Sequence, residues 1–187
     1  MTVNAHSIKN YKAGFEPWGL VLFLTVMIPN FIWFALPAPN DILRTESITP
    51  ITDTIASVCQ VMFAAALCVI VRKDRVKFRQ HRAKLVQDDE KYASKMRTKR
   101  EARALYGVAL KPDLLTAAVV CCLLIYFTGW IFYYKGFVGP PVIVCLTVSP
   151  CLAFVLFAIN RKNFFAAVPA VVFMICHCIY GIVNFIL

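Results

Sequence analysis

Charged residues are scarce in this chain of 187 residues: they make up 16% of it, whereas hydrophobic residues make up 60%. Water-soluble domains contain about 45–50% apolar and about 25% charged residues. With a mean hydropathy of +0.68, the sequence excludes a water-soluble domain of this size. Its apolar runs are continuous and do not alternate with polar residues, which excludes the pattern of an outer-membrane β-barrel.

The sequence motifs of common enzyme classes are also missing. The chain has no C-x-x-C, H-E-x-x-H, G-x-S-x-G or P-loop motif, the spacings used for thiol redox chemistry, catalytic zinc, serine nucleophiles and nucleotide phosphates. Asp53 is the single acidic residue within the apolar runs, so paired carboxylates for acid–base chemistry are missing as well. We therefore predict no enzymatic activity and no cofactor.

The eight cysteines all lie inside apolar runs. Secreted disulfide frameworks place cysteines in polar loops, so these cysteines are typical of small hydrophobic residues instead. The sequence Cys176–His177–Cys178 resembles a metal motif. On a helix, however, side chains at i and i+2 point apart and cannot hold one ion together, and structural zinc sites use C-x₂₋₄-C spacing. We predict no metal site.

Five apolar runs are each long enough for a helix across a bilayer, which needs about 20 residues for a core of about 30 Å. A cleaved signal peptide is the alternative for the first run, but that run exceeds the core of about 7–15 residues in a signal peptide, and Pro37 and Pro39 follow it. Because Pro29 lies within this run, we expect a kink or local unwinding near Asn30. The predicted fold is all-α: one membrane domain over residues 1–187, with a polar lead (1–17) and five transmembrane helices at 18–36, 51–71, 114–133, 142–159 and 164–187.

Basic residues fall almost entirely on one side of these five helices. Eighteen of the 20 Lys and Arg residues share one side, and only Arg44 and Lys135 lie on the other. Basic loops stay in the cytoplasm. The sequence therefore predicts a multi-pass protein of the cell membrane, with its N-terminus in the cytoplasm and its C-terminus outside.

Residues 72–112 form the one long polar segment, with a net charge of +9. Its composition favours helix, and a helical hairpin that bends near the acidic residues 88–90 would return the chain to the membrane. Three interpretations stay open: a solvated extension whose charge sets the topology, adhesion to anionic lipid headgroups at about 1 kcal/mol per basic residue near the surface, or nucleic-acid binding. The last is disfavoured because no aromatic recognition motif accompanies the charge. The lipid-contact candidates are Arg72, Lys73, Arg75, Lys77 and Arg79.

A few polar side chains interrupt the apolar runs, and such groups face another helix or a wet cavity. At a rise of about 1.5 Å per residue, Asn30, Gln60 and His177 lie roughly 18, 17 and 20 Å from the cytoplasmic ends of their helices. One hypothesis is an outward-opening polar pocket that binds a small solute or conducts protons through His177. The alternative is that these groups only hydrogen-bond helix to helix, at about 0.6 kcal/mol each. The candidate ligand-binding residues are Asn30, Asp53, Gln60, His177, Tyr180 and Asn184.

Three stretches of the sequence resemble an uncharacterised family of small bacterial polytopic membrane proteins. They are IPNFIWFALPAPND, TDTIASVCQ and KNFFAAVPAVVFMICHCIYGIVNF. The resemblance covers the apolar runs and implies a five-helix membrane architecture in a bacterial membrane. It implies no activity.

Two functions follow from these patterns. The first is binding or translocation of a small solute through an outward-facing polar pocket. The alternative is a non-enzymatic membrane interaction protein whose basic cytoplasmic hairpin binds anionic lipid or a protein partner. Nucleic acid is not an expected partner.

Overall fold

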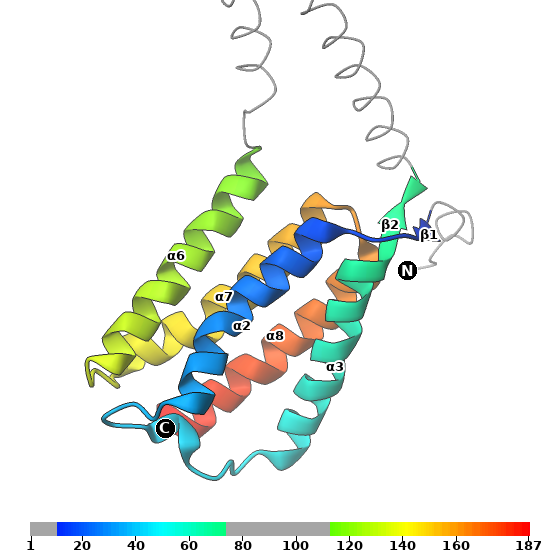
Figure 1. Cartoon of the computed structure of the whole chain (residues 1–187). Coiled ribbons are helices and arrows are strands. Elements are labelled where there is room, and N and C mark those ends of the chain that lie inside the picture. Colours follow the sequence, from blue (N-terminus) through cyan, green and yellow to red (C-terminus); the bar gives the residue numbers. More distant parts are fainter. Residues whose placement is uncertain (1–10, 74–112) are drawn as a thin grey trace, which may run out of the picture.

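The computed structural model describes residues 11–73 and 113–187 of the chain. Five of its helices are long and apolar enough to cross a membrane, which confirms the predicted all-α fold of a multi-pass membrane protein (Figure 1). They are α2 (Pro17–Ala35), α3 (Pro50–Val69), α6 (Leu114–Tyr134), α7 (Pro140–Asn160) and α8 (Phe164–Phe185).

The helix boundaries lie within two residues of the predicted ones, because local signals set them. Helices α2, α3 and α7 each begin at a proline, whose fixed φ and missing N–H suit the first helical position. Asp113 and Asn163 accept hydrogen bonds from backbone N–H groups in the first turns of α6 and α8. Helix α2 continues through Pro29 as one helix.

The structure adds a small sheet to the predicted helices. The second membrane helix ends at Val69, and the next residues leave it as the strand β2 (Ile70–Arg72). This strand pairs antiparallel with β1 (Tyr11–Ala13), so that Tyr11 lies opposite Arg72 and Ala13 opposite Ile70. The prediction of a helix as far as residue 71 was therefore wrong at this end, and the strand in the polar lead was not predicted.

Part of the predicted basic segment lies outside the described residues. Arg72 and Lys73 are described, whereas Arg75, Lys77, Arg79 and the predicted helical hairpin are not.

Helix α7 is the centre of the bundle. It packs against α6 on one side and α8 on the other, and α8 packs in turn against α3. Helix α2 lies in front of α7 in Figure 1 and packs only loosely against α3, α6 and α7. In the most apolar stretch of α7, 61% of the residues are buried, compared with 22% to 28% in the other four helices. Those four helices therefore have broad faces for lipid.

A cluster of phenylalanine rings holds the middle of the bundle together. The Phe63 ring of α3 lies 4.8 Å from Phe154 of α7 and 5.2 Å from Phe173 of α8, centroid to centroid. Phe23 of α2 reaches the same cluster, 6.3 Å from Phe154. The cluster therefore joins four of the five helices.

Two glycines allow helices to approach more closely than any other residue would. A Cβ atom on Gly19 of α2 would lie 2.6 Å from the Leu67 carbonyl oxygen of α3, and one on Gly181 of α8 would lie 2.5 Å from Cγ2 of Thr147 in α7. Small residues at such crossings are typical of helices that pack in membranes.

Charge is distributed unevenly between the two ends of the bundle. One end carries β1, β2 and the α7–α8 turn (Figure 1), and its described basic residues are Lys12, Arg72, Lys73, Arg161 and Lys162. We call it the basic end. At the other end are the short 3₁₀ helix η1 (Ile42–Arg44) and the α6–α7 turn, with the basic residues Arg44 and Lys135.

Candidate functional site

The six residues of the predicted polar pocket fall into separate groups. The Asn30 amide of α2 donates hydrogen bonds to the Tyr126 hydroxyl of α6 (3.0 Å) and to the Val26 carbonyl (3.1 Å). The Tyr126 hydroxyl donates to the same carbonyl at 3.0 Å. The three groups together join α2 to α6, so the side chain of Asn30 is engaged in a helix–helix contact.

Asp53 and Asn184 are brought together through Thr49, at the end of the bundle opposite the basic end. The Asn184 Oδ1 atom accepts from the Ile48 N–H at 2.8 Å, and its Nδ2 donates to the Thr49 hydroxyl at 3.0 Å. That hydroxyl donates to Asp53 at 3.3 Å. This chain of hydrogen bonds ties the loop before α3 to the end of α8.

His177 and Tyr180 lie against each other on α8. The His177 ring is stacked between Phe173, at 5.1 Å and 14°, and Tyr180, at 6.0 Å and 17°. Among the described residues, neither His177 nor the half-buried Gln60 of α3 makes a side-chain hydrogen bond. The Tyr180 hydroxyl makes none there either. In the predicted pocket, Gln60, His177 and Tyr180 are therefore the members whose side chains form no hydrogen bond to the described residues.

The described residues contain no group of three or more His, Cys, Asp and Glu side chains that could hold a metal ion. All eight cysteines are free thiols.

The basic end contains a more elaborate set of polar contacts, centred on Asn163. This residue is only 4% exposed. Its Nδ2 atom donates to the carbonyls of Ala66 and Ile70, both at 2.9 Å, while its Oδ1 accepts from the Ala166 N–H at 3.2 Å. The Asn163 side chain therefore supplies hydrogen-bond partners both to carbonyls at the end of α3 and to the first turn of α8.

The segment before α2 donates hydrogen bonds to the other carbonyls at the end of α3. The Gly14 N–H donates to the Val69 carbonyl and the Glu16 N–H to the Cys68 carbonyl, both at 2.8 Å. The last carbonyls of a helix have no partner within it, and an unsatisfied backbone group is costly in a membrane. Residues far away in the sequence therefore supply the partners that α3 needs. We call this arrangement of β1, β2, Glu16, Arg161 and Asn163 the basic junction.

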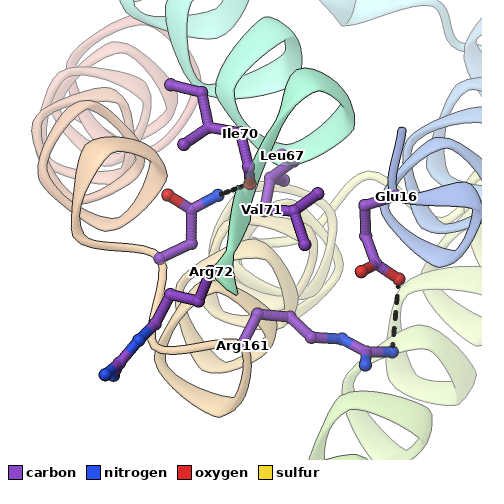
Figure 2. Close-up of a pocket in the computed structure, with 7 residues that line it drawn as sticks. Glu16, Leu67, Ile70, Val71, Arg72 and Arg161 are labelled. Carbon is purple, nitrogen blue, oxygen red and sulfur yellow. Dashed lines mark hydrogen bonds and ion pairs between the residues drawn. The ribbon is translucent and has the colours of Figure 1, made fainter. Parts of the chain in front are cut away.

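A buried ion pair joins α2 to α7 within the basic junction. The Arg161 guanidinium lies 3.9 Å from Glu16 Oε1, whose side chain is 5% exposed, and it also lies over the Phe157 ring at 4.9 Å. Figure 2 shows the pair at the edge of a small cavity. The cavity has a volume of about 10 Å³, enough for about one water molecule. Its lining residues are Glu16, Leu67, Ile70, Val71, Arg72, Arg161 and Asn163.

Tyr11 connects β1 to the α7–α8 turn. Its hydroxyl donates to the Lys162 carbonyl at 2.9 Å and accepts from the Phe164 N–H at 3.3 Å. Its ring packs edge-on against Phe165, with 5.1 Å between centroids. Lys162 has a positive φ of 50°, which this tight turn requires. Tyr11 thereby fixes the position of the turn relative to β2.

At the opposite end, Asp41 is the centre of a second polar cluster. Its carboxylate accepts hydrogen bonds from Trp33 Nε1 (2.8 Å), the Tyr133 hydroxyl (2.8 Å), Arg44 Nε (2.7 Å) and the Ala38 N–H (3.3 Å). The Asp41 side chain is 11% exposed. The cluster ties α2 and η1 to the end of α6.

These hydrogen bonds determine the acidity of Asp41. Partial burial by itself raises the pKa of its carboxyl, because burial disfavours the charged form. The hydrogen bonds from its four donors stabilise that charged form and outweigh the burial, so the pKa of Asp41 lies below its ordinary value.

The sequence patterns did not identify the residues at the centres of these two clusters: Glu16, Asp41 and Asn163. All three carry a local signal. Asn163 and Glu16 each directly precede an apolar run, which is the N-cap position, and Pro17 follows Glu16. Asp41 follows the sequence Pro-Ala-Pro-Asn, which ends a helix.

No protein-family model matches the chain, and neither a curated protein nor a solved structure matches it.

The Asp41 cluster leads to a prediction about stability. Replacing Asp41 with Asn removes the charge and turns one acceptor into a donor that faces other donors. Hydrogen bonds to charged groups contribute about 1.5–3 kcal/mol, so we expect Asp41→Asn to lower the free energy of unfolding by about 2 kcal/mol. Denaturant unfolding in detergent micelles measures this change in the free energy of unfolding. Glu46→Gln, an exposed acid in the same loop, is the matched control and should change little.

The stability that Asp41 contributes depends on pH in a defined direction. A carboxyl with a lowered folded pKa stabilises the protein above its unfolded pKa, about 3.9, and this contribution disappears as the pH falls through the folded pKa. The stability difference between the wild-type protein and Asp41→Asn should therefore shrink below about pH 4. A difference that is constant from pH 7 to pH 3 would show that Asp41 does not act through its charge.

Proposed function

We propose that this protein is a non-enzymatic multi-pass protein of a bacterial cell membrane, and that its basic end lies at the cytoplasmic surface and binds anionic lipid headgroups. The observation that carries the proposal is the gathering of charge at one end of the bundle. The basic residues of β1, β2 and the α7–α8 turn are at that end.

The long basic segment is attached to the same end. It leaves the described structure after Lys73 and re-enters it at Asp113, directly before α6. Both attachment points are at the basic end (Figure 1). Residues 74–112 carry 12 Lys and Arg against five Asp and Glu, and their net charge of +7 therefore adds to that of the described residues. At about 1 kcal/mol for each basic residue near an anionic surface, this charge supports strong adhesion.

Exposed aromatic side chains mark the level of the headgroups at this end. Phe15 is 62% exposed and Trp18 is 60% exposed, both at the start of α2, and Phe164 is 55% exposed at the start of α8. Aromatic side chains, tryptophan above all, are favoured where apolar chains meet polar headgroups. Cations beside such aromatics fit the surface of a bilayer better than they fit a soluble partner in the cytoplasm.

The proposed orientation has a direct test. In a variant whose native cysteines are replaced by alanine, Lys135→Cys and Lys162→Cys place single thiols at opposite ends of the bundle. An impermeant maleimide should label Lys135→Cys in intact cells, because basic loops stay inside, and Lys162→Cys only after the cells are permeabilised. Labelling of Lys162→Cys in intact cells would contradict the orientation.

Headgroup binding is tested with the full-length protein in vesicles. We expect spin-labelled phosphatidylglycerol to show a larger motionally restricted fraction than spin-labelled phosphatidylcholine, and we expect salt to reduce the difference. Replacing Arg72, Lys73, Arg75, Lys77 and Arg79 with Gln should reduce the preference several-fold.

Two controls accompany this measurement. Replacing Lys91, Lys95, Arg97, Lys99 and Arg100 with Gln removes the same charge further from the membrane helices in the sequence, and it should have a smaller effect. His177→Ala should have none. Equal restricted fractions for the two lipids in the wild-type protein would contradict the proposed function.

A second candidate function is the binding of a small solute between α3 and α8. It is favoured by the polar groups of Gln60 and His177, which make no side-chain hydrogen bond among the described residues. It is weakened by the engagement of Asn30 and Asn184 in contacts between segments. Under this function, His177→Ala should abolish a solute's effect on stability, while neutralising the five basic residues from Arg72 to Arg79 should leave that effect unchanged.

A further inference from the structure

We propose that residues 31–47, which we call the strap, swing as a unit about Pro29 and away from α6, and that the hydroxyl groups of Tyr133 and Tyr134 are the latch that holds the strap closed. The strap consists of the last part of α2, the loop after it and η1. It lies at the end of the bundle opposite the basic end (Figure 1). This device is separate from the proposed function, which concerns the basic end.

The strap has little apolar packing to hold it. Helix α2 buries residues as far as Pro29 and none beyond it, and η1 buries none. Ala38 is the single buried residue of the strap, and half-buried side chains such as Ile42 and Leu43 make its other contacts with the core. Segments with few buried apolar contacts open locally at a lower free energy than the rest of a protein.

Pro29 gives the strap a pivot. A proline within a helix has no N–H for the carbonyl four residues earlier, here that of Thr25, and helices bend at such positions. The Tyr126 hydroxyl of α6 holds the chain on both sides of this point. It donates to the Val26 carbonyl at 3.0 Å and accepts from the Asn30 amide at 3.0 Å. The pivot is therefore fixed to α6, although the chain beyond it is not buried.

The chain is fixed again directly after the strap. The Ile48 N–H donates to Asn184 of α8 at 2.8 Å, and the Thr49 hydroxyl accepts from the same side chain at 3.0 Å. The strap therefore spans two anchored points, so its swing leaves the start of α3 in place.

Asp41 makes the strap a single unit. Three of the four donors to its carboxylate belong to the strap itself: Trp33 Nε1, the Ala38 N–H and Arg44 Nε. Arg44 also donates to the Trp33 carbonyl at 2.6 Å and lies over the Trp33 ring at 5.0 Å. When the strap moves, Asp41 therefore loses only its hydrogen bond from Tyr133.

Among the described residues, four hydrogen bonds join the strap to α6 and to the α6–α7 turn. They run from the Tyr133 hydroxyl to Asp41 (2.8 Å), from the Leu43 N–H to the Tyr133 hydroxyl (3.2 Å), from the Tyr134 hydroxyl to the Leu36 carbonyl (3.0 Å) and from Asn40 Nδ2 to the Gly136 carbonyl (3.0 Å). Two tyrosine hydroxyls take part in three of the four. Release of these two groups is therefore sufficient to free most of the strap from α6.

Opening changes what this end of the bundle presents. In the closed form Tyr133 is fully buried, and its hydroxyl is occupied by Asp41 and Leu43. Once the strap has moved, the Tyr133 and Tyr134 hydroxyls and the Gly136 carbonyl lose their partners. The end of α6 then offers a polar surface that the closed form hides.

Spin labels on the strap and on α6 test the movement. In a variant whose native cysteines are replaced by alanine, Phe34→Cys and Val120→Cys carry the labels, because both side chains are exposed. Pulsed EPR of the full-length protein in lipid vesicles measures the distribution of distances between them. With the latch intact, we expect one main distance and a minor longer component. Tyr133→Phe together with Tyr134→Phe keeps both rings but removes three hydrogen bonds, and it should raise the longer component at least threefold.

Three controls locate the movement. Tyr180→Phe is the matched substitution, because the Tyr180 hydroxyl of α8 makes no hydrogen bond to the described residues, and it should leave the distribution unchanged. Labels at Val21→Cys and Val120→Cys report the part of α2 before Pro29, and their distance should stay the same in every variant. Pro29→Ala restores the missing N–H and should reduce the longer component of the double tyrosine variant.

Three results would overturn the strap. The first is an unchanged distribution between Phe34→Cys and Val120→Cys in the double tyrosine variant. The second is equal broadening for both label pairs, since the whole of α2 would then move and not the part beyond Pro29. The third is a longer component that Pro29→Ala does not reduce, which would contradict the pivot. None of these results bears on lipid binding at the basic end, which has its own test.

Discussion

The structure depends on the hydrogen bonds that satisfy the carbonyl groups at the carboxyl end of α3. In a membrane, a helix end whose carbonyls have no partner is unfavourable. Helix α3 ends at Val69, and the extended strand β2 begins at the next residue, Ile70. The carbonyls at this end accept hydrogen bonds from Asn163, Gly14 and Glu16. These donors come from the start of α8 and the segment before α2. One terminus therefore fixes where three membrane helices meet and where the basic segment leaves the bundle.

Helix α2 shows the consequence most clearly, because it packs against its neighbours far less than α7 or α8 does. Specific contacts hold it at three levels. At the basic end these are the Glu16–Arg161 pair and the close approach of Gly19 to α3, and in the middle the hydrogen bond from Asn30 to Tyr126. The Asp41 cluster holds the far end. Polar contacts at these three levels therefore add to the limited apolar packing of α2, whereas α6, α7, α8 and α3 pack closely against one another.

The sequence predicted the five helices well, because length, apolar composition and the prolines at helix starts are local properties. It did not predict the end of α3, since the donors that complete it are remote in the sequence and become visible only when the helices are packed. The predicted polar pocket was uncertain for the same reason, because its residues are remote from one another in the sequence. Asn30, Gln60 and His177 lie at similar depths, but depth does not tell which helices are neighbours, and Asn30 faces α6 while the other two are on α3 and α8. Asp41 and Asn163 could have been found from their positions next to helix ends.

The most direct test of the completed α3 terminus is the stability of Asn163→Ala relative to Asn160→Ala in denaturant unfolding. Asn163 bonds two buried carbonyls and one helix N–H, whereas Asn160 makes exposed side-chain bonds to Asp113 and Thr116. In Asn163→Ala the Ala66 carbonyl keeps the Ile70 N–H as a donor. The Ile70 carbonyl loses its donor, at a cost of about 1–3 kcal/mol, and α8 loses its N-cap, at a cost of about 0.5–2 kcal/mol. We expect Asn163→Ala to lose about 2–4 kcal/mol and Asn160→Ala about 1 kcal/mol or less. Equal losses in the two variants would contradict the central role of this terminus.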